Sequence, residues 1–362
     1  MKIFKRILKI LAILIGVVVL AAAAMIGYLS ITEYKPAAEE QVSVVQSGEG
    51  EKLSALDKSE FTVLTWNVGY CALGKESDFF MDGGDDVRPD SKSIVTKNYA
   101  GILQAIRNID PDFLMLQEVD SDSHRSYNLD EVAGLRRDLG ADGAAASAYA
   151  LNYKCNFVPY PLPKTLGKVN SGLLTISDYA VTEAERVSLP CPFSWPMRVA
   201  NLKRCLLVER IPIEGSDKEL VLVNLHLEAY DDGQGKMAQT RQLRTLLDAE
   251  YRKGNYVIAG GDWNQIFPET DNTYPVLLTN WIPGALDRAD LGKWNYAYDD
   301  SVPTCRLLNQ PYDPADSAHT QYYVIDGFMV SPNLTVKSVR TQDEQFAFSD
   351  HNPVLLTVEL GA

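Results

Sequence analysis

The chain has 362 residues, of which 46% are hydrophobic and 23% are charged. This composition suffices for one large domain with a sizeable core, or two modest ones, and it argues against disorder on a large scale. The net charge is −14; four of the 34 basic residues precede the first apolar run, so the remaining 30 stand against 48 acidic residues, a balance of −18. An acidic domain repels phosphate polymers at long range, which disfavours tight nucleic-acid binding.

The N-terminal segment predicts a membrane anchor. Residues 1–9 (MKIFKRILK) are basic, and residues 10–29 form an apolar run of about twenty residues without a charge. A helix of that length spans a hydrocarbon core of roughly 30 Å. Because positive charges stay on the cytoplasmic side, we expect residues 1–9 to be a cytoplasmic stub and the rest of the chain to be extracellular.

A cleaved signal peptide is the alternative for this segment. Residues 21–24 are four alanines, which supply the small side chains of a cleavage site. The apolar run is nevertheless longer than a usual signal-peptide core. We therefore prefer a single-pass anchor in the cell membrane of the kind found on bacterial surface proteins, followed by a linker over residues 30–58 and one catalytic domain over residues 59–362.

Helical and strand periodicities then alternate along the chain. Helices are predicted over residues 94–109, 130–139 and 237–250. Strands are predicted over residues 61–68, 112–117, 172–176, 181–189, 205–213, 220–227, 256–259, 322–330, 334–339 and 354–358. Residues 271–318 are irregular and rich in aromatic residues and proline. This pattern favours an α/β fold in which two sheets pack face to face with helices outside.

Polar side chains that can bind metals lie at the ends of these apolar strands. Any one of them could be a turn former, and His226 could be a half-buried structural histidine. Burying carboxylates or imidazoles costs free energy unless they are paired or bound to metal, and strand ends that meet at one edge form a natural site. The candidates are Asn67, Glu118, His226, Asp262, Asn264, Asp326, Asp350 and His351.

The residue types indicate one kind of chemistry. Carboxylates and an amide oxygen favour a hard cation such as Mg²⁺, Mn²⁺ or Ca²⁺. Two histidines beside aspartates can transfer protons and contact phosphate. The sequence has no HExxH or GxSxG element, which argues against a zinc protease or a serine hydrolase. The five cysteines are widely spaced without a CxxC, so we expect buried or free thiols, with one disulfide left open.

Seven motifs, read in order, resemble those of the endonuclease/exonuclease/phosphatase superfamily, the deoxyribonuclease I-like proteins. They are TWNVG, LQEVD, SGLLTIS, VNLHL, GGDWNQ, YYVIDGFMV and SDHNPV, and they cover nearly all of residues 61–359. GDWN and SDHNPV are the most specific of them. The resemblance implies a four-layer α/β/β/α sandwich and hydrolysis of phosphate esters with a divalent cation.

The same resemblance implies metal-binding roles for three residues. Glu118 would be the principal metal ligand, Asn67 would lie close to the metal and the phosphate, and Asp350 would assist. The cation would be Mg²⁺, with Mn²⁺ or Ca²⁺ as alternatives.

Catalytic roles are implied for five more residues. Asp262 would orient or deprotonate the attacking water, assisted by Asn264. His351 would contact the phosphoryl oxygens, and Asp326 would hold its ring. His226 would bind phosphate or aid the leaving group. In-line displacement at phosphorus needs these elements: a metal, an activated water and charge stabilisation.

The substrate remains open at the level of sequence. Tethering near a bilayer favours a lipid headgroup or another small phosphodiester; a nuclease is disfavoured by charge, and a phosphomonoesterase, a catalytically silent binding member and an unrelated exported binding protein are the alternatives. We expect a monomer. Residues 69–90 could form a lid or a packed insertion, and the aromatics of residues 271–318 could line a pocket or pack as core. Phosphate contacts or surface ion pairs are both open for Arg125, Lys168 and Arg204.

Overall fold

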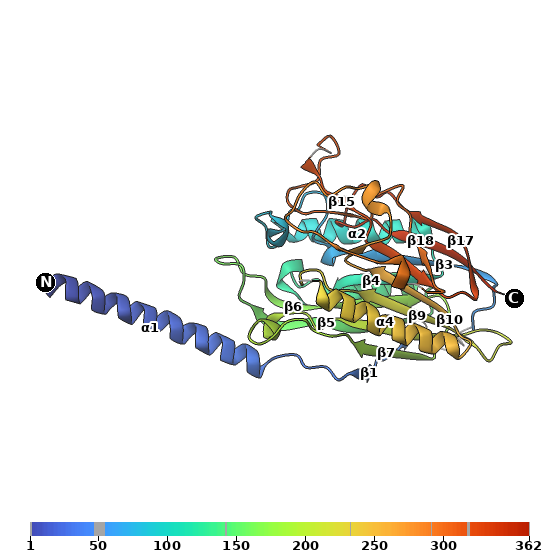
Figure 1. Ribbon diagram of the computed structural model, residues 1–362, viewed down its shortest axis with the longest axis horizontal. Helices are drawn as coiled ribbons and strands as arrows, with labels where there is room; N and C mark the ends of the chain where they lie inside the picture. The colour runs from blue at the N-terminus through green and yellow to red at the C-terminus, as the bar shows by residue number, and fades with distance from the viewer. Residues whose placement is uncertain are drawn as a thin grey trace.

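The computed structural model has two seven-stranded sheets packed face to face, with helices on both outer faces (Figure 1). One sheet has the order β17-β18-β3-β4-β6-β5-β2 and the other the order β1-β7-β8-β9-β10-β16-β13. The structure describes residues 2–46, 55–141, 143–231, 233–290, 292–316 and 319–361.

The first sheet combines the N-terminal half of the domain with its last two strands. β3 and β4 run parallel, and β18 joins β3 antiparallel. The strands, in sheet order, are β17 (Leu334–Thr341), β18 (Val354–Leu360), β3 (Glu60–Asn67), β4 (Phe113–Asp120), β6 (Gly167–Ser177), β5 (Ala146–Val158) and β2 (Val45–Gln46).

The second sheet is built around a parallel pair, β9 and β10, with antiparallel neighbours on both sides. Its strands, in sheet order, are β1 (Glu39–Gln41), β7 (Glu183–Ser188), β8 (Cys205–Pro212), β9 (Glu219–His226), β10 (Tyr256–Asp262), β16 (Asp326–Val330) and β13 (Asn295–Ala297). Short pairs lie outside both sheets: β11 (Gln265–Ile266) with β12 (Gly284–Ala285), and β14 (Cys305–Arg306) with β15 (Tyr322–Tyr323).

Three apolar layers hold the sandwich together. The central core lies between the sheets and contains Phe113 and Leu207. A second cluster joins α2 (Lys92–Ile109) and α3 (Glu131–Ala141) to the first sheet, and a third joins α4 (Gln234–Arg252) to the second. The structure therefore confirms the predicted α/β/β/α arrangement.

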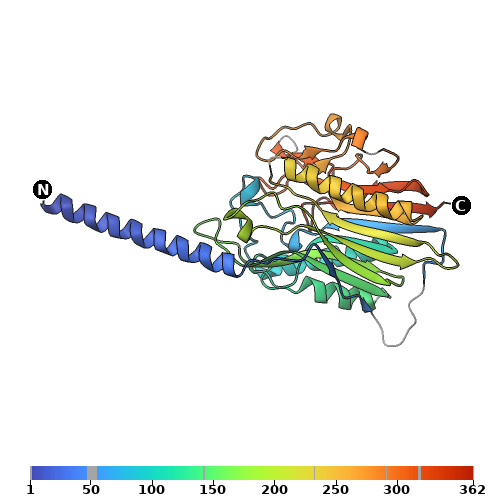
Figure 2. The same ribbon diagram turned by 60° about the horizontal axis from the view of Figure 1, so that its bottom comes forward.

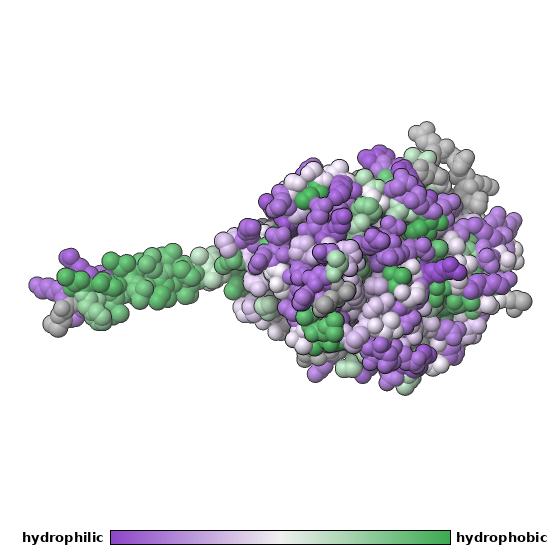
Figure 3. Space-filling model, turned by 90° about the horizontal axis from the view of Figure 1, so that it is seen from above, coloured by the Kyte–Doolittle hydropathy of each residue, from purple (hydrophilic) through white to green (hydrophobic). Residues whose placement is uncertain are grey.

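The N-terminal helix α1 (Lys2–Ile31) extends beyond the predicted residues 10–29 at both ends. It is long and apolar enough to cross a membrane, judged by length and composition. Apolar residues cover it from the basic N-terminal turns to the domain (Figure 3). Only its last turns touch the rest of the chain, where Leu29 is buried and Met25 packs beside it.

Within the predicted linker, residues 30–58, several residues join the sandwich. β1 pairs with β7 at the edge of one sheet, and β2 pairs with β5 at the edge of the other. Leu56 is buried and bridges to Ile213. Residues 47–54 lie outside the described part of the chain.

Other differences from the predicted elements are local. β5 was not predicted, and the strand predicted over residues 322–330 is divided into β15 and β16. In the irregular region, Trp294 is buried, and Tyr296 and Tyr298 pack against the same cluster as α4, so these three aromatics serve the core. The remaining short 3-10 helices are η1 (Gly69–Cys71), η2 (Phe80–Asp82), η3 (His124–Ser126), η4 (Met197–Ala200), η5 (Thr270–Asn272) and η6 (Arg288–Asp290).

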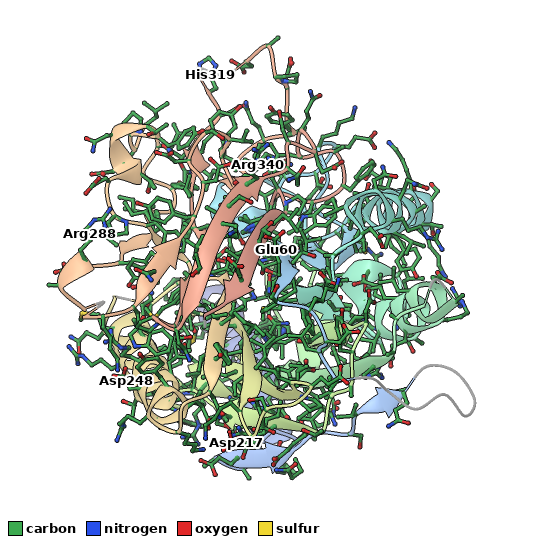
Figure 4. The ribbon with its side chains drawn as sticks, turned by 90° about the vertical axis from the view of Figure 1, so that its right-hand side faces the viewer. Glu60, Asp217, Asp248, Arg288, His319 and Arg340 are labelled. Carbon is green, nitrogen blue, oxygen red and sulfur yellow. The ribbon has the colours of Figure 1, made fainter. Side chains whose placement is uncertain are left out.

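The strands have a common direction relative to α1. Glu60 starts β3 opposite Glu359, near the C-terminus at the end of the domain away from α1 (Figures 1 and 4). Asn67 closes β3 at the opposite end. Because Asn67 also hydrogen-bonds Asp262 at the end of β10, the C-terminal ends of the parallel strands meet at the end of the domain that faces α1.

Candidate active site

Asn67 links the two sheets at their shared edge. Its amide nitrogen donates to Oε1 of Glu118 at 3.2 Å and to Oδ2 of Asp262 at 3.0 Å. Its Oδ1 accepts a hydrogen bond from the main-chain nitrogen of Gly69 at 3.0 Å. One buried amide therefore holds two carboxylates that come from different sheets.

Glu118 reaches this edge through an irregularity in β4. The register of β4 with β6 shifts between Leu116 and Val119, and Glu118 has a φ of +56°, in the left-handed region. Such a bulge can redirect a side chain. The Glu118 side chain is 23% exposed, whereas that of Asp262 is 2% exposed, so Glu118 lies toward the opening of the site.

Asp262 closes β10 and is held by its neighbours. The main-chain nitrogen of Asn264 donates to Oδ1 of Asp262 at 2.9 Å. The Asn264 side chain instead donates to the carbonyl oxygen of Leu227 at 2.9 Å. Burial raises the pKa of Asp262 to about 6, although His351 acts against this increase. Asp262 is thus mainly ionised at neutral pH and can accept a proton.

Asp326 and His351 form the shortest contact of the cluster. Nδ1 of His351 lies 2.8 Å from Oδ2 of Asp326, and Nε2 lies 3.8 Å from Oδ2 of Asp262. Burial opposes protonation of the His351 ring, but Asp326 and the thiol of Cys305 outweigh it and raise the pKa of His351 well above its usual value. A protonated ring held in this way can donate from Nε2 to a negatively charged oxygen.

His226 is the second histidine of the cluster and has the opposite electrostatics. Its Nε2 lies 3.3 Å from Oδ2 of Asp262 and 4.0 Å from Oε1 of Glu118. Burial lowers the pKa of His226 well below its usual value, and the positive charges of Arg204 and His351 add to this effect. The ring of His226 is therefore neutral at physiological pH, unlike that of His351.

Asp350 faces the loop that follows β3. Burial raises its pKa to about 7, with His351 lowering it and Glu118 raising it further. A Cβ placed on Gly69 would lie 2.9 Å from Oδ1 of Asp350, and Gly69 has a φ of +50°. The backbone therefore passes this carboxylate at a distance that only glycine permits.

The donor set fits a hard divalent cation. Asn67, Glu118 and Asp350 offer amide and carboxylate oxygens, which Mg²⁺, Mn²⁺ and Ca²⁺ prefer. The raised pKa of Asp350 reflects burial and the nearby charge of Glu118, an electrostatic cost that a cation would offset. Two further groups of potential ligands have donor atoms within 4.8 Å of one another: Asp262, Asp326 and His351; and Cys305, Asp350 and His351.

Three residues near the site were not predicted from sequence. The hydroxyl of Tyr70 is buried without a hydrogen-bond partner among the described residues. Asp82 accepts from the hydroxyl of Tyr230 at 3.1 Å and from the main-chain nitrogen of Leu308 at 3.3 Å. Tyr70 follows the first motif directly, which was the available signal for it. Asp82 depends on contacts between distant parts of the chain.

The three basic residues considered as phosphate contacts are all in ion pairs. Arg125 makes two hydrogen bonds to Asp120, at 3.1 and 2.9 Å, and both side chains are buried. Arg204 pairs with Glu228 at 3.4 Å and donates to the carbonyl oxygen of His226 at 3.2 Å. Lys168 pairs with Asp122 near the surface. Arg125 and Arg204 therefore support the site from behind.

An α/β/β/α sandwich with an acidic and histidine-containing cluster at one sheet edge defines a class of hydrolases. The family model described as "Endonuclease/Exonuclease/phosphatase family" matches residues 64–351. The chain belongs to that family, whose members hydrolyse phosphate esters. No curated protein matches the chain.

Solved structures with low sequence identity share the fold. An endonuclease/exonuclease/phosphatase from Beutenbergia cavernae DSM 12333 aligns with a TM-score of 0.57 at 19% identity, covering 84% of this chain and 72% of that one. A second, from Bacteroides vulgatus, gives 0.53 at 17% identity, with 84% and 100% covered. ANGEL2, described as a 2',3'-cyclic phosphatase, gives 0.55 at 15% identity, with 89% and 99% covered.

Proposed function

We propose that this protein is a metal-dependent phosphodiesterase, anchored in the cell membrane by α1, which hydrolyses lipid headgroups or other small phosphodiesters outside the cytoplasm. Membership of the family supports phosphate-ester hydrolysis. The observation that carries the proposal is the joint placement of Asp262 and the Asp326–His351 pair beside the Asn67–Glu118 contact.

The two histidines and Asp262 divide the chemistry between them. Asp262 would orient the attacking water and accept its proton, since its carboxylate is ionised at neutral pH. His351, protonated and held by Asp326, would donate to a phosphoryl oxygen as negative charge develops. The neutral ring of His226 would hydrogen-bond the phosphate or assist the leaving group. Asn264 would keep Asp262 in place through its main chain.

Glu118, Asp350 and Asn67 would hold the cation. When bound, a divalent ion polarises the phosphoryl group and stabilises developing charge. Glu118 is the best placed of the three to meet a ligand because its side chain is partly exposed. The N-terminus would remain in the cytoplasm, because the four basic residues of the chain's first nine precede the apolar run.

A nuclease is the second candidate. Its support is the family itself, which is named for endonucleases and exonucleases. The balance of −18 outside the anchor opposes it, because long phosphate polymers would be repelled. A catalytically silent binding protein is less well supported, because every catalytic position expected from the motifs carries a suitable side chain.

Hydrolysis by the full chain in detergent micelles tests the proposal. The substrates would be bis-(p-nitrophenyl) phosphate, sphingomyelin, inositol phosphates and plasmid DNA, each with Mg²⁺ and with chelator, and Asp262→Ala would be the control. The full chain is used because Leu29 and the β1 and β2 strands pack on the domain. We expect Mg²⁺-dependent turnover that is lost in Asp262→Ala. No turnover by a folded, metal-binding protein would contradict the hydrolase proposal, and fastest turnover of DNA would favour the nuclease.

A further inference from the structure

Two loops of the domain expose large apolar side chains. Leu162 is 80% exposed and Tyr160 61%, in the loop between β5 and β6; Met197 is 67% exposed and Trp195 58%, in the loop between β7 and β8. These are the highest exposures of large apolar residues in the described part of the domain outside α1. Exposed apolar side chains gathered in this way mark interaction surfaces. We call these four side chains the apolar tips.

The loops that carry the apolar tips lie where α1 joins the domain. The indole nitrogen of Trp195 donates to the hydroxyl of Ser30 at 3.0 Å. Leu29 is in one apolar cluster with Val158, at the base of the β5–β6 loop, and with Val199, which follows Met197. Figures 1 and 2 show both loops at the end of the domain from which α1 leaves.

The chain at this junction is fixed by ion pairs. The carboxylate of Glu33, two residues after α1, is 3% exposed and lies 3.1 Å from Nε of Arg198 and 3.4 Å from Nζ of Lys203. Arg198 and Lys203 belong to the same loop as Trp195. A helix that crosses a bilayer would therefore bring this loop to the membrane surface directly, because no free linker separates them.

The apolar tips share a sheet edge with the candidate active site. Asp120, which ends β4 just after Glu118, pairs with Ser171 of β6, and β6 continues to the β5–β6 loop at Gly167. Those four residues span roughly 13 Å of strand. On the second sheet, Leu206 at the start of β8 pairs with Leu225, next to His226. Both loops thus leave the sheets beside catalytic candidates.

A basic pocket lies between the β5–β6 loop and the catalytic edge. It has a volume of about 400 Å³, and its lining includes Arg88, His124 and Lys164. Lys164 follows Leu162 in the loop, and His124 lies in η3, shortly after β4. Positive side chains in this place would suit a phosphate-bearing headgroup.

We propose that the apolar tips enter the headgroup layer of the same bilayer that α1 spans, so that the catalytic edge faces the lipid surface and the substrate is a phosphodiester lipid. Trp and Tyr favour this layer, where an apolar ring meets water. Insertion would depend on apolar contact, because a domain with a balance of −18 gains nothing from anionic lipid. The substrate assignment rests on the proposed hydrolase function; the docking does not.

The test uses the full chain reconstituted in phosphatidylcholine–sphingomyelin vesicles. Docking is read from quenching of Trp195 fluorescence by doxyl-labelled lipid, taken as the difference between the wild type and Trp195→Phe. We expect strong quenching in the wild type and in Asp262→Ala, because docking does not need catalysis. Trp195 fluorescence unaffected by the quencher would overturn the proposal.

Activity is compared on vesicle lipid and on soluble bis-(p-nitrophenyl) phosphate. The double variant Leu162→Ser/Met197→Ser should lose about tenfold or more on lipid and keep turnover of the soluble ester. The matched control is Leu277→Ser/Ile282→Ser, since these side chains are 57% and 54% exposed in a different segment. The control should keep both activities. Equal lipid turnover in all three proteins, or an oligonucleotide preferred over lipid, would overturn the substrate assignment.

The two readouts separate the two proposals. Quenching of Trp195 without turnover of any substrate would leave the docking in place and reject the hydrolase. Turnover of the soluble ester without quenching would leave the hydrolase in place and reject the docking.

Discussion

Asp326 lies with Oδ2 2.8 Å from Nδ1 of His351, and its second oxygen is buried without a hydrogen-bond partner among the described residues. The pair is inaccessible to solvent, because Asp326 is 0% and His351 5% exposed. A buried carboxylate that contacts only one face of an imidazole fixes the ring and leaves Nε2 for another partner.

Asp326→Asn should therefore reduce kcat by about 10- to 100-fold and change KM little, because the variant loses the charge that orients and protonates His351. Steady-state kinetics on bis-(p-nitrophenyl) phosphate would measure this. The chain offers a matched control in Asp316→Asn, since Asp316 lies 2.6 Å from Nδ1 of His319 at the surface. A similar loss in both variants would argue against a specific role for Asp326.

Glu118→Gln should weaken Mg²⁺ binding about tenfold or more, because it removes the most exposed carboxylate of the cation site. Ligand binding to the folded state raises the melting temperature, so Mg²⁺ titrations followed by thermal unfolding report affinity without activity. Glu76→Gln, in an exposed ion pair with Lys97, is the control and should match the wild type. An unchanged Mg²⁺ dependence in Glu118→Gln would place the cation elsewhere.

Gly69→Ala should impair the site and not only the fold. Gly69 and Gly215 both have left-handed backbones, with φ of +50° and +72°, and alanine at either costs about 1–2 kcal/mol. Only at Gly69 would the new Cβ meet Asp350, whereas Gly215 has open space. We expect similar losses of unfolding free energy but a roughly 10- to 100-fold greater loss of kcat in Gly69→Ala. Equal activities would show that the close approach to Asp350 is unimportant.

Glu209 should make the stability of the fold depend on pH. Burial raises its pKa to about 8, and neither carboxylate oxygen has a hydrogen-bond partner in the described part of the chain. Between about pH 4.5 and pH 8 the folded chain holds a proton that the unfolded chain releases, so this contribution to stability falls as pH rises.

Glu209→Gln should remove that dependence and stabilise the protein at pH 9, relative to the wild type, by a few kcal/mol. Urea unfolding in detergent at pH 5, 7 and 9 would measure it, with the exposed Glu359→Gln as control. If the wild type and Glu209→Gln lost stability in parallel between pH 5 and pH 9, Glu209 would not be the group responsible.

The fold followed from the sequence wherever the apolar pattern was strong. β3, β4, β9 and β10 were predicted near their observed positions, and because parallel strands end together, so was the clustering of the residues that follow them. β5 was missed because its sequence, ASAYALNYKCNFV, is rich in residues that strands disfavour. It is held by antiparallel pairing with β6 along most of its length.

The site was predictable in membership but not in detail. The motifs named Asp262 and His351, yet nothing in the local sequence indicated the left-handed bulge at Glu118 or the main-chain contact from Asn264 to Asp262. The segment of residues 69–90 was left open between lid and packed insertion. Asp82 lies buried against Leu308, a contact across more than 200 residues that local periodicity cannot reveal.

The ion pairs of Glu33 have a consequence for how the protein would find its substrate. With Glu33 held by Arg198 and Lys203, and Ser30 by Trp195, the domain has no free tether on which to swing. In a bilayer it would retain rotation about the membrane normal and lateral diffusion. The enzyme would then search in two dimensions at a fixed height, meeting molecules that share its membrane far more often than those in the surrounding solution.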